Sequence, residues 1–138
     1  MTIYVTDKLL YSALCARLKY YPCTVTDKFN QYIDIAVATE PQFALTHNVG
    51  ALLVDSAELP QISGDGKVNI VLSCGMSEKD TLTFSAIDGD TAALCIQRNV
   101  NICGITPEMG EYPVFYDENL PLWHNIVISF CEILLRNA

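Results

Sequence analysis

Apolar residues in the first half of the chain follow two spacings, one typical of strands and one of a helix. Leu10, Leu14 and Leu18 recur at every fourth position, which predicts a helix over 8–21. Asp7 stands where it can cap the first turn, and a proline follows the last. The neighbouring segments are rich in β-branched residues or form continuous apolar runs, so we expect buried strands. These strands are predicted over 2–7, 23–27, 32–39, 50–56 and 68–74.

The second half of the chain changes to strict alternation of apolar and polar residues. The segments 80–87 and 91–100 flank Asp-Gly-Asp at 88–90, which predicts an antiparallel hairpin. The segment 110–117 is predicted as an edge strand, because Pro113 has no amide proton for a neighbouring strand.

The last segment has apolar residues three and four positions apart, which predicts an amphipathic helix with Arg136 near its end. Its apolar positions are Trp123, Ile126, Val127, Phe130, Ile133 and Leu134. A helical turn or loop is predicted over 41–50, and a loop over 59–67. We therefore expect one α/β domain over 1–138, a mostly parallel sheet flanked by helices with an antiparallel hairpin extension in the second half.

The composition of the chain limits the classes of partner that it is expected to bind. Hydrophobic residues make up 51% and charged residues 17%, so the sheet is covered on both faces or an apolar patch is left for a partner or a second copy. The formal charge of −8 and the lack of a basic stripe argue against nucleic acid and against anionic membranes. The apolar runs are too short to span a bilayer.

The six cysteines do not follow the pattern of a disulfide framework. Cys15, Cys95 and Cys131 lie in apolar segments, there is no CxxC pair, and no signal peptide precedes them. Cysteine is commonly a small buried hydrophobe. We expect reduced core thiols in a cytoplasmic protein.

Cys74 is the best-placed nucleophile candidate, because an apolar strand runs directly into Cys74 and Gly75. A reactive thiol needs a nearby base or a helix N-terminus to lower its pKa. His47 and His124 are the only histidines, and both are distant in sequence. We expect a buried thiol at a corner between two strands, with a thiol-dependent enzyme as an alternative.

Polar residues at the carboxyl ends of the predicted strands form a second candidate site. Asp55, Gly75, Ser77, Lys79 and Arg98 are candidates for binding a small anionic or nucleotide-like ligand. For Arg98 an ion pair is the favoured role, with anion binding as the alternative. The glycine patterns GxGxxG and GxxxxGK[ST], which cradle phosphate, do not occur.

Metal and cofactor sites are not expected. The two histidines are isolated, with no HxxxH or Cys/His spacing, and His124 is expected to cap a helix or to lie at an interface. Asp55, Glu58 and Asp80 lie at strand ends, where carboxylates can meet for acid/base chemistry. The aromatic residues near the C-terminus are expected in the core or at an interface. They are Tyr112, Phe115, Tyr116 and Trp123.

The segments GALLVDSAEL (50–59) and VNIVLSCGMSEKDTLTFSAI (68–87) resemble the later part of the central domain of Mur ligases. In that family a buried strand ends in an acidic turn, here 55–58, and a second strand enters a glycine-containing turn, here 75–80. WHNIVISFCEIL (123–134) is similar to the His-Asn-Val segment that opens the following helix. The resemblance covers roughly residues 50 to 135 and implies an α/β fold.

The chain also departs from the Mur ligase pattern. Those enzymes hold ATP on a glycine-rich loop with Lys and Thr, which this chain lacks, and Ile128 and Ser129 stand where a further Asn is expected. The substrate-binding and C-terminal ligase domains do not fit in 138 residues. The resemblance therefore implies a relative without the ATP-binding loop.

These observations lead to a ranked set of functions. We expect a non-catalytic cytoplasmic interaction or scaffold domain that forms a homo-oligomer or binds a protein partner through an apolar patch. The alternatives are the ligand-binding module at the strand ends and the thiol enzyme that uses Cys74.

Overall fold

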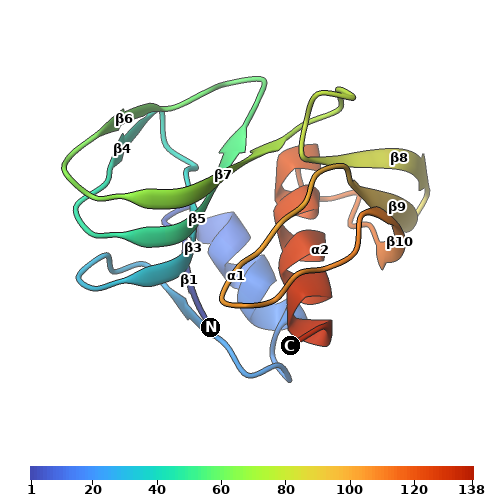
Figure 1. Cartoon of the computed structure of the whole chain (residues 1–138). Coiled ribbons are helices and arrows are strands. Elements are labelled where there is room, and N and C mark those ends of the chain that lie inside the picture. The colour runs from blue at the N-terminus through green and yellow to red at the C-terminus, as the bar shows by residue number, and fades with distance from the viewer.

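The computed structural model describes residues 1–138, and most of its strands belong to one large twisted sheet (Figure 1). The strands are β1 (Thr2–Tyr4), β2 (Thr24–Thr26), β3 (Ile33–Val37), β4 (Gln42–Ala44), β5 (Val49–Asp55), β6 (Gln61–Ser63), β7 (Val68–Cys74), β8 (Leu82–Asp88), β9 (Thr91–Ile96) and β10 (Gly110–Phe115). The helices are α1 (Lys8–Arg17) and α2 (Leu122–Arg136). The large sheet has eight strands in the order β10-β9-β8-β7-β5-β3-β1-β2, and β4 and β6 pair separately.

The first half of the sheet is parallel and the second half is antiparallel, which confirms the predicted α/β fold class. Strands β2, β1, β3, β5 and β7 run parallel. The chain leaves β1 toward β2 on one side and later adds β3, β5 and β7 on the other side. The strand order therefore reverses between β1 and β3, and the carboxyl ends of these strands share one edge of the sheet.

The predicted hairpin is formed by β8 and β9, and β10 pairs with β9 as the edge strand. Gly89 supplies the turn with a φ of +62°, a conformation that favours glycine. Pro113 lies in β10 at the edge, as predicted. The parallel half joins this unit through a single residue pair, Cys74 with Leu82. The corner expected after Cys74 is therefore present.

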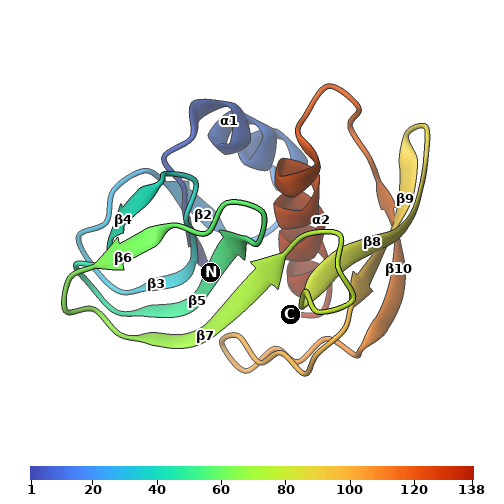
Figure 2. The same ribbon diagram turned by 90° about the horizontal axis from the view of Figure 1, so that it is seen from above.

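Both helices lie on the same face of the sheet, as Figure 2 shows most clearly. Leu10 and Leu14 of α1 share one hydrophobic core with Phe130 of α2 and with the apolar residues of β7 to β9. The helix α2 contacts α1 and strands β7, β8, β9 and β10. Every residue from His124 to Leu135 is buried. The amphipathic pattern therefore underestimated how much of this helix is buried, since the curved sheet, α1 and the loop between β9 and β10 all contribute to the core around it.

The second face of the sheet is covered over β3 and β5 by two short strands rather than by a helix. Phe43 and Leu45, in and after β4, pack on Leu52 and on other residues of β3 and β5. The sequence prediction of a helical turn or loop over 41–50 is wrong at β4, and the loop predicted over 59–67 contains β6. Two strands of three residues each have too little periodicity to be recognised, and only their pairing with each other defines them.

Two further expectations need correction. The helix predicted over 8–21 ends at Arg17, and the backbone N–H of Leu18 closes its last turn. All six cysteines are free, but Cys15 and Cys103 are exposed and only Cys74 and Cys131 are buried. Cys15 is exposed because the apolar stripe of α1 that packs on the sheet consists of Leu10 and Leu14. No helix of the structure is long and apolar enough to cross a membrane.

Candidate functional site

A cavity lies where the strand order reverses, at the carboxyl ends of β1, β3 and β5. We call it the carboxyl-end cavity. Its volume is about 260 Å³, somewhat below the range of about 300–1,000 Å³ typical of sites for drug-sized ligands, so it suits a small ligand. Its lining residues are Asp7, Ala38, Thr39, Glu40, Pro41, Asp55, Glu58, Leu59, Trp123 and His124.

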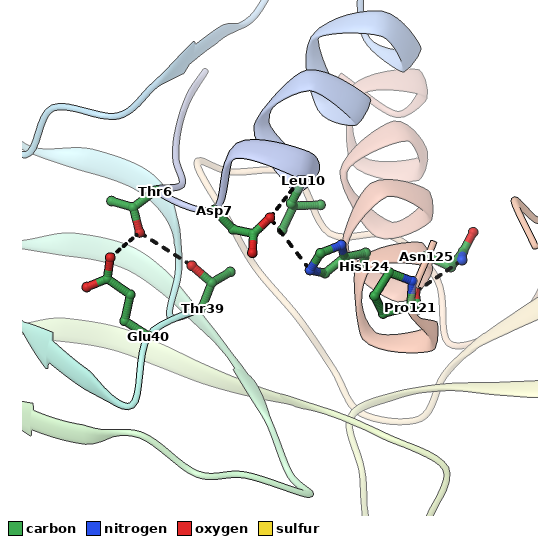
Figure 3. Close-up of polar contacts among 8 residues, drawn as sticks. All are labelled: Thr6, Asp7, Leu10, Thr39, Glu40, Pro121, His124 and Asn125. Carbon is green, nitrogen blue, oxygen red and sulfur yellow. Dashed lines mark hydrogen bonds and ion pairs between the residues drawn. The ribbon is translucent and has the colours of Figure 1, made fainter. Parts of the chain in front are cut away.

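Asp7 joins the two helices at one side of this cavity. Its Oδ1 accepts a hydrogen bond of 2.9 Å from the backbone N–H of Leu10, which is the helix cap that the sequence predicts. The same oxygen lies 4.0 Å from Nε2 of His124 at the start of α2, and Figure 3 shows the imidazole facing the carboxylate. This distance exceeds that of a hydrogen bond.

The imidazole of His124 is enclosed but has no hydrogen-bond partner. Its side chain is 8% exposed, and its Nδ1 is buried without any partner. Burial lowers the pKa of His124 from its ordinary value of 6.5, while the charge of Asp7 opposes the shift. The ring is therefore largely neutral at neutral pH. The expected capping role is wrong, because no side chain caps α2.

A second polar group joins the ends of β1 and β3, and two of its members, Thr39 and Glu40, line the cavity. The hydroxyl of Thr6 donates a hydrogen bond of 3.0 Å to Oε1 of Glu40. Its oxygen also lies 3.4 Å from the hydroxyl oxygen of Thr39 (Figure 3). These contacts hold Glu40 against the end of β1, so its carboxylate and that of Asp7 belong to the same wall.

Asn125 fixes the position of its neighbour His124. Its side chain is buried and bridges the loop that precedes α2. The amide oxygen accepts a hydrogen bond from the N–H of Asp117, and the amide nitrogen donates to the carbonyls of Asp117, Leu120 and Pro121. Because the hydrogen bonds of this buried amide are satisfied, they fix the position at which α2 starts. They thereby also fix the direction in which the side chain of His124 points.

Of the residues singled out from sequence at the strand ends, Asp55 lies in the cavity, and Glu58 joins it there. Gly75, Ser77, Lys79 and Arg98 are not among its lining residues. Asp7, Thr39, Glu40 and His124 were not predicted as site residues. The available signal was their position at the end of a predicted strand or directly after it, or, for His124, near a helix start.

The loop between β7 and β8 contains Gly75, Ser77 and Lys79, and its hydrogen bonds are made within the loop and to the flanking strands. Most of its amide protons already have acceptors within the protein, so they do not form a cradle for phosphate. The pairs are Gly75 N–H to Leu82 O, Ser77 N–H to Asp80 Oδ2, Lys79 N–H to Ser77 Oγ, Asp80 N–H to Ser77 O and Thr81 N–H to Ser73 Oγ.

The buried Asp80 is at the centre of this loop rather than in the cavity with Asp55 and Glu58. A side chain on Gly75 would collide with the carboxylate of Asp80 and with Ser56 Oγ. Gln97 closes the other side, since its Nε2 donates to the carbonyls of Asp80 and Ser77 at 2.7 and 3.3 Å. These contacts indicate a structural loop.

Arg98 does not form the ion pair favoured from its sequence position. Its guanidinium is exposed and donates to the carbonyl of its neighbour Gln97 at 2.9 Å. No carboxylate lies within 4.0 Å of it. Nothing nearby holds the side chain in one place for an anion.

Cys74 is completely buried, and its thiol lies 3.8 Å from the carbonyl oxygen of Leu72. Burial raises the pKa of Cys74 well above its ordinary value, and the charges of Asp80 and Asp55 add to the shift. A thiol that is neutral and enclosed has neither the thiolate form nor the access that a nucleophile needs.

A larger hollow of about 400 Å³ lies near the end of α1 and is lined by Arg17, Arg136, Glu132 and Phe115, among others. Glu132 Oε1 lies 3.5 Å from Arg17 and 3.3 Å from Arg136. The guanidinium of Arg17 also stacks over the ring of Phe115 at 4.8 Å. Both guanidinium groups therefore share one carboxylate as their ion-pair partner, and Nη1 of Arg17 is buried without a hydrogen bond.

The aromatic residues near the C-terminus have different surroundings. Phe84 packs edge-on against Tyr116 in the main core, Phe115 lies under Arg17, and Trp123 lines the carboxyl-end cavity. No group of three or more His, Cys, Asp or Glu side chains is arranged to hold a metal ion.

Comparison of the chain with protein-family models, with curated proteins and with solved structures finds no match, so the similarity to Mur ligases stays a prediction.

Proposed function

We propose that this chain is a ligand-binding domain and that the carboxyl-end cavity is its site. The observation that carries the proposal is the position of the cavity at the reversal of strand order between β1 and β3. Open α/β sheets bind their ligands at such points, because loops diverge there to opposite faces and leave a crevice.

The chemistry of the lining supports binding. Side chains from the ends of three strands and the start of α2 converge on one small volume. Several of them keep unused hydrogen-bonding capacity, above all His124. Convergent polar groups beside apolar walls, here Trp123 and Leu59, are typical of small-molecule sites.

The proposed site differs from the ligand site that the sequence predicts. The sequence placed it around Asp55, Gly75, Ser77 and Lys79, and only Asp55 lines the cavity. The internal hydrogen bonds of the β7–β8 loop favour a structural role for the other three. The burial of Cys74 disfavours the thiol-enzyme alternative.

The test is an amide NMR titration of the full chain with three probes that share a four-carbon chain: putrescine, succinate and 1,4-butanediol. We expect at least one probe to shift the amides of Thr39, Asp55 and His124 together. If none of the probes shifts these amides, or if the largest shifts lie around Lys79, the cavity is not the site.

A second candidate function is interaction with another copy of the chain through the uncovered part of the sheet. The apolar cluster under the β4–β6 pair includes residues of β3 and β5 and reaches Val68 at the start of β7, but further along β7 Val71 is 53% exposed, and Met76 in the loop after it is 57% exposed. Val71 pairs with Leu52 and therefore points to the same face. Val71 is the exposed apolar residue of β7 on this face, between Asn69 and Ser73, and it would be the centre of a contact between two packed sheets.

Light scattering after size exclusion tests this second candidate over a range of concentrations. We expect a dimer that Val71→Lys converts to a monomer, while Leu9→Lys on α1, which has the same exposure of 53% on the other face of the sheet, serves as the comparison. A monomer at every concentration would remove the candidate. Circular dichroism checks that both variants are folded.

A further inference from the structure

We infer that the ligand of the carboxyl-end cavity is a small molecule with a positively charged amino group, an inference that rests on the proposed function of this cavity. The sequence predicted the opposite charge, an anionic or nucleotide-like ligand. The charges and hydrogen bonds of the lining decide between the two.

The cavity has an excess of negative charge that the protein does not neutralise. Four carboxylates line it, from Asp7, Glu40, Asp55 and Glu58, and no lysine or arginine does. No lysine or arginine nitrogen lies within 4.0 Å of any of the four. Like charges gathered around one small volume repel each other, and a bound cation relieves that repulsion. An anion would add to it.

Three of the four carboxylates are held in place by a hydrogen bond, and all four keep free oxygens. Asp7 and Asp55 each accept one backbone hydrogen bond, from Leu10 and Ala57, and Glu40 accepts one from Thr6. Each of these bonds uses a single oxygen of a group that has two. The remaining oxygens are acceptors in fixed positions, and an ammonium group has three donors and no acceptor.

His124 gives an independent indication of a ligand. Its side chain is 92% buried, since 8% is exposed, its ring faces Asp7 in the cavity wall, and neither ring nitrogen makes a hydrogen bond. A buried polar group without a partner is costly unless something binds it. Because burial keeps the imidazole largely neutral, Nε2, which faces Asp7 at the cavity wall, can accept a hydrogen bond from an ammonium group in the tautomer that carries its proton on Nδ1.

The rest of the wall suits the carbon chain of an amine. Pro41, Leu59 and Trp123 contribute apolar surface next to the carboxylates. Aliphatic stems pack on such surface, and an indole ring also attracts a nearby cation. The volume of about 260 Å³ limits the ligand to a small one. Short aliphatic amines and diamines meet all of these conditions.

Isothermal titration calorimetry of the full chain with putrescine, in an amine-free buffer at pH 7.5 and low salt, tests the inference. Succinate and 1,4-butanediol are the charge-reversed and neutral probes of matched length. We expect putrescine alone to bind. Asp55→Asn and Glu58→Gln should each weaken it about tenfold, since each removes a charge-assisted contact. Glu111→Gln, on the edge strand β10, is the matched control and should leave the affinity unchanged.

The outcomes separate this inference from the proposed function. If succinate or butanediol binds in the cavity and putrescine does not, the cavity is a site but the assignment of charge is wrong. If putrescine binds equally well to all three variants, it is held only by the overall charge of the protein, and the inference fails. If no probe perturbs the amides of the cavity, both the inference and the proposed function fail.

Discussion

One carboxylate oxygen of Asp7 caps the first turn of α1 through Leu10 N–H at 2.9 Å and also faces Nε2 of His124 at 4.0 Å. The starts of both helices therefore meet at a single side chain. Since both helices pack on the same face of the sheet, this contact also closes one side of the carboxyl-end cavity.

Replacement of Asp7 separates its capping role from its charge. We expect Asp7→Ala to lower the free energy of unfolding by about 1 kcal/mol, because the cap of α1 is lost. Asp7→Asn keeps an oxygen that can accept the capping hydrogen bond, so the free energy of unfolding should fall by only a few tenths of the loss expected for Asp7→Ala. Urea unfolding followed by circular dichroism measures both. Asp65→Ala, at an exposed loop position, is the control. Equal losses for Asp7→Ala and Asp65→Ala would contradict the capping role.

The buried His124 makes stability depend on pH in a defined direction. Burial lowers its pKa in the folded protein below the ordinary 6.5, so between pH 6.5 and the lowered value the unfolded chain binds more protons. Its contribution to stability is complete above pH 6.5 and is lost as the pH falls through the folded pKa.

The corresponding measurement is the urea midpoint of the wild type and of His124→Gln between pH 7.5 and 5. The wild type should lose stability more steeply toward low pH than the variant. His47→Gln is the matched control, since His47 is exposed. Parallel curves for the wild type and His124→Gln would show that this histidine does not titrate differently on folding.

Gly75 is required for steric reasons and not for its backbone conformation, since its φ is not positive. A methyl group there would meet Ser56 Oγ and the carboxylate of Asp80 at closer than van der Waals distance. We expect Gly75→Ala to cost about 1–3 kcal/mol, as overpacking usually does.

A double-mutant cycle with Ser56→Gly identifies the collision. The double variant should recover part of the loss, because one of the two obstructing groups is gone. Chemical unfolding of the two single variants and the double variant provides the measurement. Strict additivity of the two substitutions would mean that Ser56 does not limit the space at Gly75.

The cysteines should differ widely in their reaction with iodoacetamide at pH 8. Cys15 is exposed and should react first. Cys103 is also exposed, but partial burial and its hydrogen bond to Asp34 raise its pKa to about 11, so it should react slowly. The buried Cys74 and Cys131 should react only in urea, since burial raises the pKa of Cys131 to about 12 and that of Cys74 well above its ordinary value. Peptide mass spectrometry locates the label. Rapid labelling of Cys74 in the folded protein would revive the thiol-enzyme alternative.

Local features of the chain were predictable where neighbouring residues alone decide them. The period of Leu10 and Leu14 predicted α1, and Asp7 before them predicted its cap, because both depend on residues one turn apart. The turn at Gly89 was predictable for the same reason, since a two-residue hairpin turn needs a residue that tolerates positive φ.

Features that depend on distant pairing were not predictable. Strand β4 exists because Phe43 pairs with Ile62 and covers the sheet, and neither short segment carries a period of its own. Arg98 was expected in an ion pair, yet the fold leaves its guanidinium beside a backbone carbonyl.

The sequence by itself determined both helices, the strands of the large sheet and the order of parallel strands before a hairpin, but not the short strands β4 and β6. Those properties follow from spacing, β-branching and turn residues within short stretches. The tertiary structure alone decided that both helices share one face of the sheet and that Asp7 and His124 face each other. It also decided that four carboxylates, and no lysine or arginine, line one cavity. The reason is physical: each of these depends on how distant segments pack against each other, and the energy of that packing belongs to the assembled sheet rather than to any one segment.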